Sequence, residues 1–337
     1  TEVGWEESKK LDIGLDLSLF YCLKLNVDYF HEMRDGIFVQ RNTIPYYTGI
    51  SQSYMPYVNM GEMMNQGVDA TLVFSKKIGD VDVMLRGSFT YARNKILDMD
   101  EPNNMWAYQN QTGHPLYQKF GYVALGLFKD QDEIDASPKQ ELGPSPRPGD
   151  IKYLDLNNDG LINTFDQKAI GYPDVPEIVY GAGASLRWKG FDFSFLFQGT
   201  AHSNFFINYN HTNAFGNAFL EQSSVLADVY NNHWSEANPD LNAKYPRLAS
   251  PGAGGNNSKL STFWMVDGSY CRLKSAELGY TIPSRITKKA GIQTLRVYLS
   301  GVNLLTFSPF KLWDPELSNV YAYPNNRTVS LALNIGF

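Results

Sequence analysis

The stretch Arg327-Thr-Val-Ser-Leu-Ala-Leu-Asn-Ile-Gly-Phe337 decides how the rest of the chain is interpreted. Its large apolar side chains recur at every second position, and small or polar residues occupy the positions between them. This period of two is typical of a β-strand with one apolar face. A length of roughly 9–11 residues is also what a tilted transmembrane β-strand needs to cross a bilayer. A membrane barrel is therefore indicated if the rest of the sequence repeats the pattern.

The same alternation does return along the chain, mostly as pairs of strands joined by a few residues. The alternating segments lie at residues 10–21, 23–30, 68–74, 81–91, 180–188, 191–197, 264–280, 295–301 and 327–337. In the segment 264–280 the alternation slips between Arg272 and Ala276, which predicts a β-bulge. Segments without the pattern separate these pairs, at residues 40–62, 94–176, 201–260 and 307–326.

Short and long connections therefore alternate along the chain, so all the short turns fall at one end of the strands. Bacterial outer-membrane barrels have this organisation, with short periplasmic turns and long extracellular loops. A β-sandwich or a jelly roll gives no reason for such sorting. We predict an all-β fold, a transmembrane antiparallel β-barrel with Phe337 on the periplasmic side and the long loops outside.

About nine strands is an odd number, whereas single-chain bacterial barrels have an even number. We therefore expect residues 1–337 to be the C-terminal portion of a larger barrel whose first strands are not in this chain. The composition agrees with a strand-based protein: mean hydropathy is −0.32, and no run of about eighteen apolar residues predicts a membrane helix. The net charge of −6 argues against nucleic acid as a partner. Cys22 and Cys271 have no metal-ligand spacing, and nothing in the pattern brings them together as a disulfide.

One motif predicts a metal site, at residues 155–166. It fits the calcium loop D-x-[DN]-x-[DN]-G, in which oxygens at positions 1, 3, 5, 7, 9 and 12 surround the ion. The ligands would be Asp155, Asn157, Asp159, the Leu161 carbonyl, Asn163 and Asp166. Aspartate at the closing position has a shorter reach than the usual glutamate, so we expect either a lower affinity for Ca²⁺ or competition by Mg²⁺. A structural role is expected, and the alternative is an Asn/Asp-rich turn that holds no metal.

The long segments are rich in aromatic residues, which favours either platforms for a sugar or peptide or the packing of loops and an interfacial girdle. These residues are Tyr46, Tyr47, Tyr54, Tyr57, Trp106, Tyr108, Tyr117, Phe205, Phe206, Tyr209, Trp313, Tyr321 and Tyr323. The packing interpretation is the simpler one for any single residue. The five histidines show no metal spacing, and there is no nucleophile elbow or recognisable pair of catalytic carboxylates. We expect no enzymatic activity.

Several segments, in the same order along the chain, resemble the SusC/RagA family of TonB-linked outer-membrane transporters of Bacteroidetes. They include Trp5 to Asp16, Asn65-Gln-Gly-Val-Asp69, Gly149-Asp-Ile-Lys-Tyr153 with the following Asp155 to Gly160, Tyr270 to Tyr280, and Val302-Asn-Leu-Leu305. The terminal aromatic residue matches as well.

This resemblance implies a barrel of 22 strands preceded by a plug domain and a TonB box, neither of which is in this chain. It implies a SusD-like lipoprotein lid on the extracellular loops and TonB-driven import of glycan or peptide oligomers through the outer membrane. It also implies that Phe337 serves as an insertion signal for the barrel-assembly machinery and that outer-membrane lipid surrounds the barrel. The resemblance does not name the substrate.

Other interpretations stay open at this point. The chain could belong to a siderophore-type TonB-dependent receptor or to a passive porin. From another class, it could be a soluble all-β carbohydrate-binding protein with a dockerin-like calcium loop.

Overall fold

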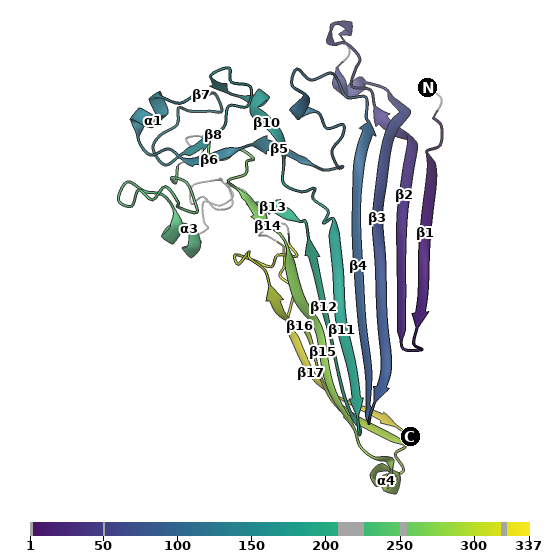
Figure 1. Cartoon of the computed structure of the whole chain (residues 1–337). Coiled ribbons are helices and arrows are strands. Elements are labelled where there is room, and N and C mark those ends of the chain that lie inside the picture. Colours follow the sequence, from purple (N-terminus) through teal and green to yellow (C-terminus); the bar gives the residue numbers. More distant parts are fainter. Residues whose placement is uncertain (1–2, 50, 208–225, 250–254, 318–321) are drawn as a thin grey trace.

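The computed structural model describes residues 3–49, 51–207, 226–249, 255–317 and 322–337. Its main element is one curved sheet whose strands lie side by side in chain order, each antiparallel to the next (Figure 1). The nine strands of this sheet are β1 (Glu7–Leu19), β2 (Leu23–Gln40), β3 (Tyr57–Ile78), β4 (Val81–Asp98), β11 (Ile178–Trp188), β12 (Phe191–Ala201), β15 (Tyr270–Thr281), β16 (Thr294–Phe307) and β17 (Thr328–Gly336). The antiparallel sheet, and its nine strands in the described part of the chain, confirm the prediction.

Short connections lie at one end of this sheet and long ones at the other. The turn between β11 and β12 has two residues, Lys189 and Gly190, both with positive φ, as the tight hairpin turns require. The connection from β15 to β16 holds α4 (Ser284–Thr287) and the 3₁₀ turn η6 (Lys288–Ala290), which Figure 1 shows at the same end as the C-terminus. The predicted alternation of short and long connections is confirmed.

The pairing of the strands places apolar side chains in rows across one face of the sheet. One such row consists of Leu186, Phe193, Leu278, Leu299 and Leu331. Phe195 and Leu333 lie two positions from members of this row on the same strands, so they share its face. Leu331 and Leu333 are 75% and 63% exposed, so no described part of the protein covers this face at β17.

The opposite face of the sheet is polar. Arg296 on β16 donates hydrogen bonds to Asp192 on β12 and, at 2.5 Å, to Glu277 on β15. Apolar residues on one face and paired charges on the other are the alternation of a membrane barrel with a polar interior.

Strand ends differ from the expected bounds. β1 runs from Glu7 to Leu19 rather than over 10–21, and β3 begins at Tyr57, inside the segment 40–62 that was expected to be a loop. β4 likewise continues to Asp98. The reason is that backbone pairing continues beyond the apolar rows, where polar residues such as Asn65 and Asn94 lie opposite one another. The predicted β-bulge in β15 is confirmed, with a register shift between Leu273 and Ser275.

The sequence predicts irregular loops at 94–176 and 201–260, but these long connections contain regular structure. They form small paired strands and short helices above the sheet in Figure 1. These are the 3₁₀ turns η1 (Tyr46–Thr48), η2 (Gln52–Tyr54), η3 (Ala107–Gln109) and η4 (Thr164–Asp166), the helices α1 (Gln131–Asp135) and α3 (Ala227–Asn232), and the strands β5 (Lys119–Tyr122), β6 (Ala124–Leu127), β7 (Lys139–Gln140), β8 (Ile151–Tyr153), β9 (Leu161–Ile162), β10 (Gln167–Ile170), β13 (Asn204–Phe206) and β14 (Met265–Asp267). Among the described residues no helix is both long enough and apolar enough to cross a membrane.

Candidate functional site

The long connections pack into one body, which we call the loop cap: residues 99–177, 202–269 and 308–317 as far as they are described. Its members share a buried apolar core that contains no residue of the nine long strands. This core consists of Tyr122, Leu127, Leu142, Ile151, Tyr153, Ile162, Ile207, Val229, Trp234, Tyr245, Trp264 and Phe310. Three connections that are far apart in the sequence thus bury their apolar side chains against one another.

A buried polar network holds the two longest connections together. Asp150 is 2% exposed and accepts hydrogen bonds from Nε and Nη2 of Arg247, both at 3.1 Å. It also accepts one at 2.9 Å from the side-chain amide of Asn257, whose own oxygen accepts from the backbone N–H of Ile151. Because each buried polar group has a partner here, the network fixes the relative position of segments about a hundred residues apart.

The first long connection, between β2 and β3, is tied to the loop cap by Asp100. Its carboxylate accepts hydrogen bonds from Arg41 Nε at 2.8 Å, from the backbone N–H groups of Asn42 and Thr43, and from the Thr43 hydroxyl. Burial on its own raises the pKa of this carboxyl, but the four donors outweigh it and lower the pKa to about 2. Asp100 is therefore charged at neutral pH and keeps the two connections in contact.

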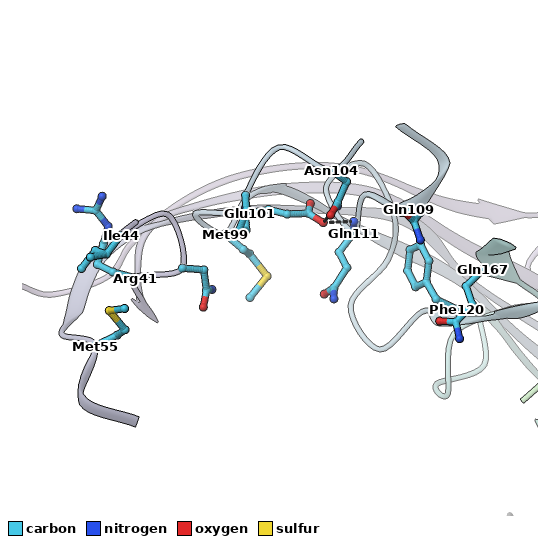
Figure 2. A pocket seen from close by; sticks show the side chains of 12 residues that line it. Arg41, Ile44, Met55, Met99, Glu101, Asn104, Gln109, Gln111, Phe120 and Gln167 are labelled. Atoms are coloured by element: carbon cyan, nitrogen blue, oxygen red, sulfur yellow. Dashed lines mark hydrogen bonds between the residues drawn. The ribbon is translucent and has the colours of Figure 1, made fainter. Parts of the chain in front are cut away.

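A cavity of about 720 Å³ opens between these two connections (Figure 2). Its lining side chains come from the β2–β3 connection and from residues 99–167 of the loop cap. They are Arg41, Asn42, Ile44, Met55, Met99, Glu101, Pro102, Asn104, Gln109, Gln111, Phe120 and Gln167. Amides and thioethers dominate this lining, and Phe120 is its one aromatic side chain.

Both charged residues of the lining are already paired within the protein. Glu101 accepts hydrogen bonds from the backbone N–H groups of Gln111 at 2.7 Å and Thr112 at 2.8 Å (Figure 2 shows the first of these). Burial raises the pKa of Glu101, but these amides outweigh it and lower the pKa below its ordinary value. Arg41 is held by Asp100. The cavity therefore presents mainly amide donors and acceptors, and its one carboxylate without an ionic partner, Glu101, is held by backbone amides, which suits a neutral polar ligand.

The structure folds the predicted calcium loop into a series of tight turns on the surface of the loop cap. Asp155 accepts hydrogen bonds from the backbone N–H groups of Asn158 and Gly160, at 2.7 and 2.9 Å. Asp159 accepts from Leu161 N–H at 2.8 Å and from the Asn157 side-chain amide at 2.9 Å. Gly160 has φ +81°, so the sharp turn that the motif requires is formed at the glycine.

The closing residue of the loop points into the protein. Asp166 is 0% exposed and accepts from the backbone N–H groups of Leu156 and Asn163, both at 2.8 Å. Asn163 in turn caps η4 by accepting from Phe165 N–H. Among the described residues no group of three or more His, Cys, Asp or Glu side chains is arranged to hold a metal ion. The carboxylates order the loop through backbone amides, and metal binding stays a prediction.

The described aromatic residues of the loops fall into a packed group and an exposed group. Phe205 lies against Phe310 and Trp313, with ring centroids 4.8 and 5.9 Å apart. Trp106 stacks on Tyr108 at 6.0 Å. A second group is open to solvent and could contact a ligand or partner: Tyr47, Tyr54, Tyr57, Tyr117 and Tyr323. Tyr209, Tyr321 and the side chain of Tyr46 lie outside the described residues.

Arg272 is a structural residue that the sequence did not reveal. It lies at the bulge of β15, is 1% exposed, and pairs with Asp314 and, at 3.1 Å, with Glu316. These pairs attach the connection between β16 and β17 to the polar face of the sheet. The sequence predicts the bulge itself, and Arg272 with its ion pairs lies next to it. Cys22 and Cys271 are free thiols.

Comparisons with known proteins agree with this architecture. No family model matches the chain. TonB-dependent receptor P3 of Formosa agariphila is 30% identical over 99% of this chain and 34% of the receptor. TonB-dependent receptor P26 of the same organism is 30% identical over 99% of the chain and 35% of the receptor. TonB-dependent receptor SusC of Bacteroides thetaiotaomicron is 22% identical over 99% of the chain and 32% of SusC.

The chain spans about a third of the length of these relatives. Among solved structures, the RagAB peptide transporter superposes with a TM-score of 0.75 at 22% identity, over 99% of this chain and 36% of that one. The RagAB peptide importer in its "closed-closed" state gives 0.73 at 23% identity, over 99% and 36%. At this identity the superposition shows the fold: a curved antiparallel sheet that matches part of a larger structure.

Proposed function

This chain is homologous over 99% of its length to TonB-dependent receptors, among them SusC, and on that premise we propose that it forms the C-terminal portion of the barrel of an outer-membrane importer. The whole protein takes up oligomeric nutrients with energy supplied through TonB, and its plug domain and remaining strands lie outside residues 1–337. The short turns and Phe337 face the periplasm, and the loop cap faces the cell exterior.

The observation that carries the proposal is the division of the molecule into two parts of opposite character. The sheet has one uncovered apolar face, which suits lipid, and one polar face, which suits a water-filled interior. The loop cap has its own buried apolar core, separate from the sheet, so it is suited to a folded position in water at the membrane exterior.

For the substrate, the cavity near Arg41 and Glu101 favours a neutral oligomer rich in hydrogen-bonding groups, either a peptide or a glycan. An anionic ferric siderophore is less compatible, because the Arg41 cation is neutralised by Asp100 while the Glu101 carboxylate keeps its negative charge. A passive porin would not need a folded cap above the sheet.

For the partner, we propose a SusD-like surface lipoprotein that docks on the long connections, at the loop-cap end of the sheet. Tyr47 and Tyr54, 88% and 82% exposed, lie in the connection between β2 and β3, and Tyr323, 78% exposed, lies in the connection between β16 and β17. Large aromatic side chains of this kind are enriched at protein interfaces.

The experiment is a deletion of the gene for the whole protein, followed by growth on defined peptides or defined oligosaccharides as the nutrient. We expect growth to fail on one of these two classes and to be restored by the intact gene, but not by a form that lacks the loop cap residues 99–177. Equal growth of the deletion strain on every peptide and oligosaccharide tested would contradict import of either class. Co-purification in mild detergent tests the partner separately.

A further inference from the structure

The end of the sheet with the short turns carries a group of cations that no described part of the protein neutralises. Arg285, Lys288 and Lys289 lie on the turn formed by α4 and η6, and all three are exposed. No ion pair among the described residues includes any of them. The sequence contains no Asp or Glu between Leu278 and Trp313, so neighbours along the chain do not balance the charge either.

The three cations share one side of this turn. Positions i, i+3 and i+4 of a helical segment are neighbours, and residues 285, 288 and 289 have this spacing. The turn is held in shape by the buried Thr287, 4% exposed, and ends at Gly291 in a left-handed conformation. Ile286, an apolar residue that is 57% exposed, lies next to the cations.

Aromatic residues mark the level on the sheet at which this turn begins. The last row of the apolar face before the short turns consists of Ile78, Val81, Trp188, Phe191, Tyr280, Val297 and Leu333. Phe191 contacts Tyr280, with ring centroids 4.5 Å apart, and Trp188 is 50% exposed. Amphipathic aromatic rings gather where the hydrocarbon of a bilayer meets its headgroups.

Tyr280 and Arg285 are only five residues apart, so the cations lie just beyond this aromatic row. If Trp188, Phe191 and Tyr280 mark the headgroup boundary, then Arg285, Lys288 and Lys289 lie at the level of the lipid phosphates. We infer that this turn binds the phosphate groups of anionic phospholipids in the leaflet on the short-turn side of the membrane. The inference rests on the proposed outer-membrane location of the sheet.

Such a contact would attach one end of the sheet to the lipid surface, because each cation near an anionic surface adds to the attraction. Lys189 adds less to it, since it is paired with Asp80 at 3.3 Å. The charges on α4 and η6 have no such competitor, which makes this turn the centre of the site.

The test uses the full-length receptor in nanodiscs made of mixed phosphatidylglycerol and phosphatidylcholine. Brominated lipids quench tryptophan fluorescence on contact, and the signal of Trp188 is obtained as the difference between the receptor and its Trp188→Phe variant. We expect brominated phosphatidylglycerol to quench Trp188 more strongly than brominated phosphatidylcholine. In a Lys288→Gln/Lys289→Gln variant, the preference of the site for phosphatidylglycerol over phosphatidylcholine should fall by about fivefold for each charge removed.

The matched control is Lys129→Gln/Lys139→Gln, which removes two exposed lysines from the loop cap at the other end of the molecule. It should leave the lipid preference unchanged. Equal quenching by the two lipids, or a preference that survives the Lys288/Lys289 substitution, would overturn the inference. Heat-modifiable migration in gels distinguishes failure of the lipid site from failure of the proposed function. A receptor that fails to form a barrel in the outer membrane contradicts both proposals. A normal barrel without the lipid preference contradicts the lipid site alone.

Discussion

Asp150 and Arg247 are separated by 97 positions in the sequence and meet as a two-pronged ion pair inside the loop cap, with Nε and Nη2 each 3.1 Å from a carboxylate oxygen. The Asp150 carboxylate is buried and Arg247 is partly buried, with side-chain exposures of 3% and 20%, and Asn257 provides a further donor to the same carboxylate. This geometry joins the two longest connections at one point.

The first prediction is that Arg247→Leu destabilises the loop cap while leaving the sheet intact. Removing one partner of a buried ion pair leaves an uncompensated charge and costs about 3–5 kcal/mol. Hydrogen–deuterium exchange on the full-length receptor should speed up at residues 149–154 and 255–264 and stay unchanged in β15 and β16. The control is Glu141→Gln, which breaks an exposed pair with Lys139 and should cost about 0–1 kcal/mol.

The second prediction concerns acid and the contact between Asp100 and the β2–β3 connection. The pKa of Asp100 is about 2 in the folded protein, below its ordinary value of 3.8, so its charged form is the one stabilised by folding. This stabilisation is fully present above about pH 4 and is lost as pH falls through about 2. Exchange at residues 41–43 should therefore accelerate in that range, and Asp100→Asn should show fast exchange already at neutral pH. Asp174→Asn, at an exposed carboxylate paired with Lys119, is the control that should change neither.

The third prediction tests the two faces of the sheet with neighbouring residues. Leu331→Arg places a charge on the apolar face and should cost roughly 2–4 kcal/mol if the position lies near the midplane of the membrane. Ser330→Arg places the same side chain on the polar face, in the row that contains Glu277, and should be tolerated. The yield of heat-modifiable barrel in the outer membrane is the measurement. Similar yields for the two variants would show that the faces are assigned incorrectly.

The fourth prediction concerns calcium. If residues 155–166 bind Ca²⁺, the ion should protect this segment from protease, and a chelator should remove the protection. Asp159→Asn keeps an oxygen that can accept from Leu161 N–H but removes one charge, so it should weaken the calcium effect without unfolding the turn. Equal resistance with calcium and with chelator would mean that the hydrogen bonds of Asp155, Asp159 and Asp166 order the loop on their own.

The strands could be predicted from the sequence because each of them separates two environments. Leu331 and Ser330 are adjacent, yet one faces away from the polar interior and the other toward it, and this contrast repeats at every second residue. The slip near Arg272 revealed a bulge for the same reason. Beyond the apolar rows, as at Asn65 and Asn94, the alternation of apolar and polar side chains ends although the backbone pairing of the strands continues. The strands therefore extend further than the sequence pattern predicts.

The loop cap could not be predicted in this way, because its contacts have no local period. Asp150, Arg247 and Asn257 come together from distant positions, and nothing in the residues around any one of them indicates the other two. The calcium motif was easier to detect because its turn chemistry is local. The motif does not indicate, however, that its last residue is buried: Asp166 accepts hydrogen bonds from the backbone N–H groups of Leu156 and Asn163.

The independence of the loop cap core has a consequence for how such proteins diversify. Since none of the apolar core residues belongs to a long strand, selection on this core and selection on the sheet act on separate positions, and Arg272 of β15 is a position that both share. A lineage can therefore remodel its cap for a new nutrient without disturbing the alternation that its membrane requires. The same separation makes the cap a suitable unit for grafting between homologous barrels. The described chain crossings at Met99, Glu177, His202, Ser269 and Ser308 are the joints to preserve.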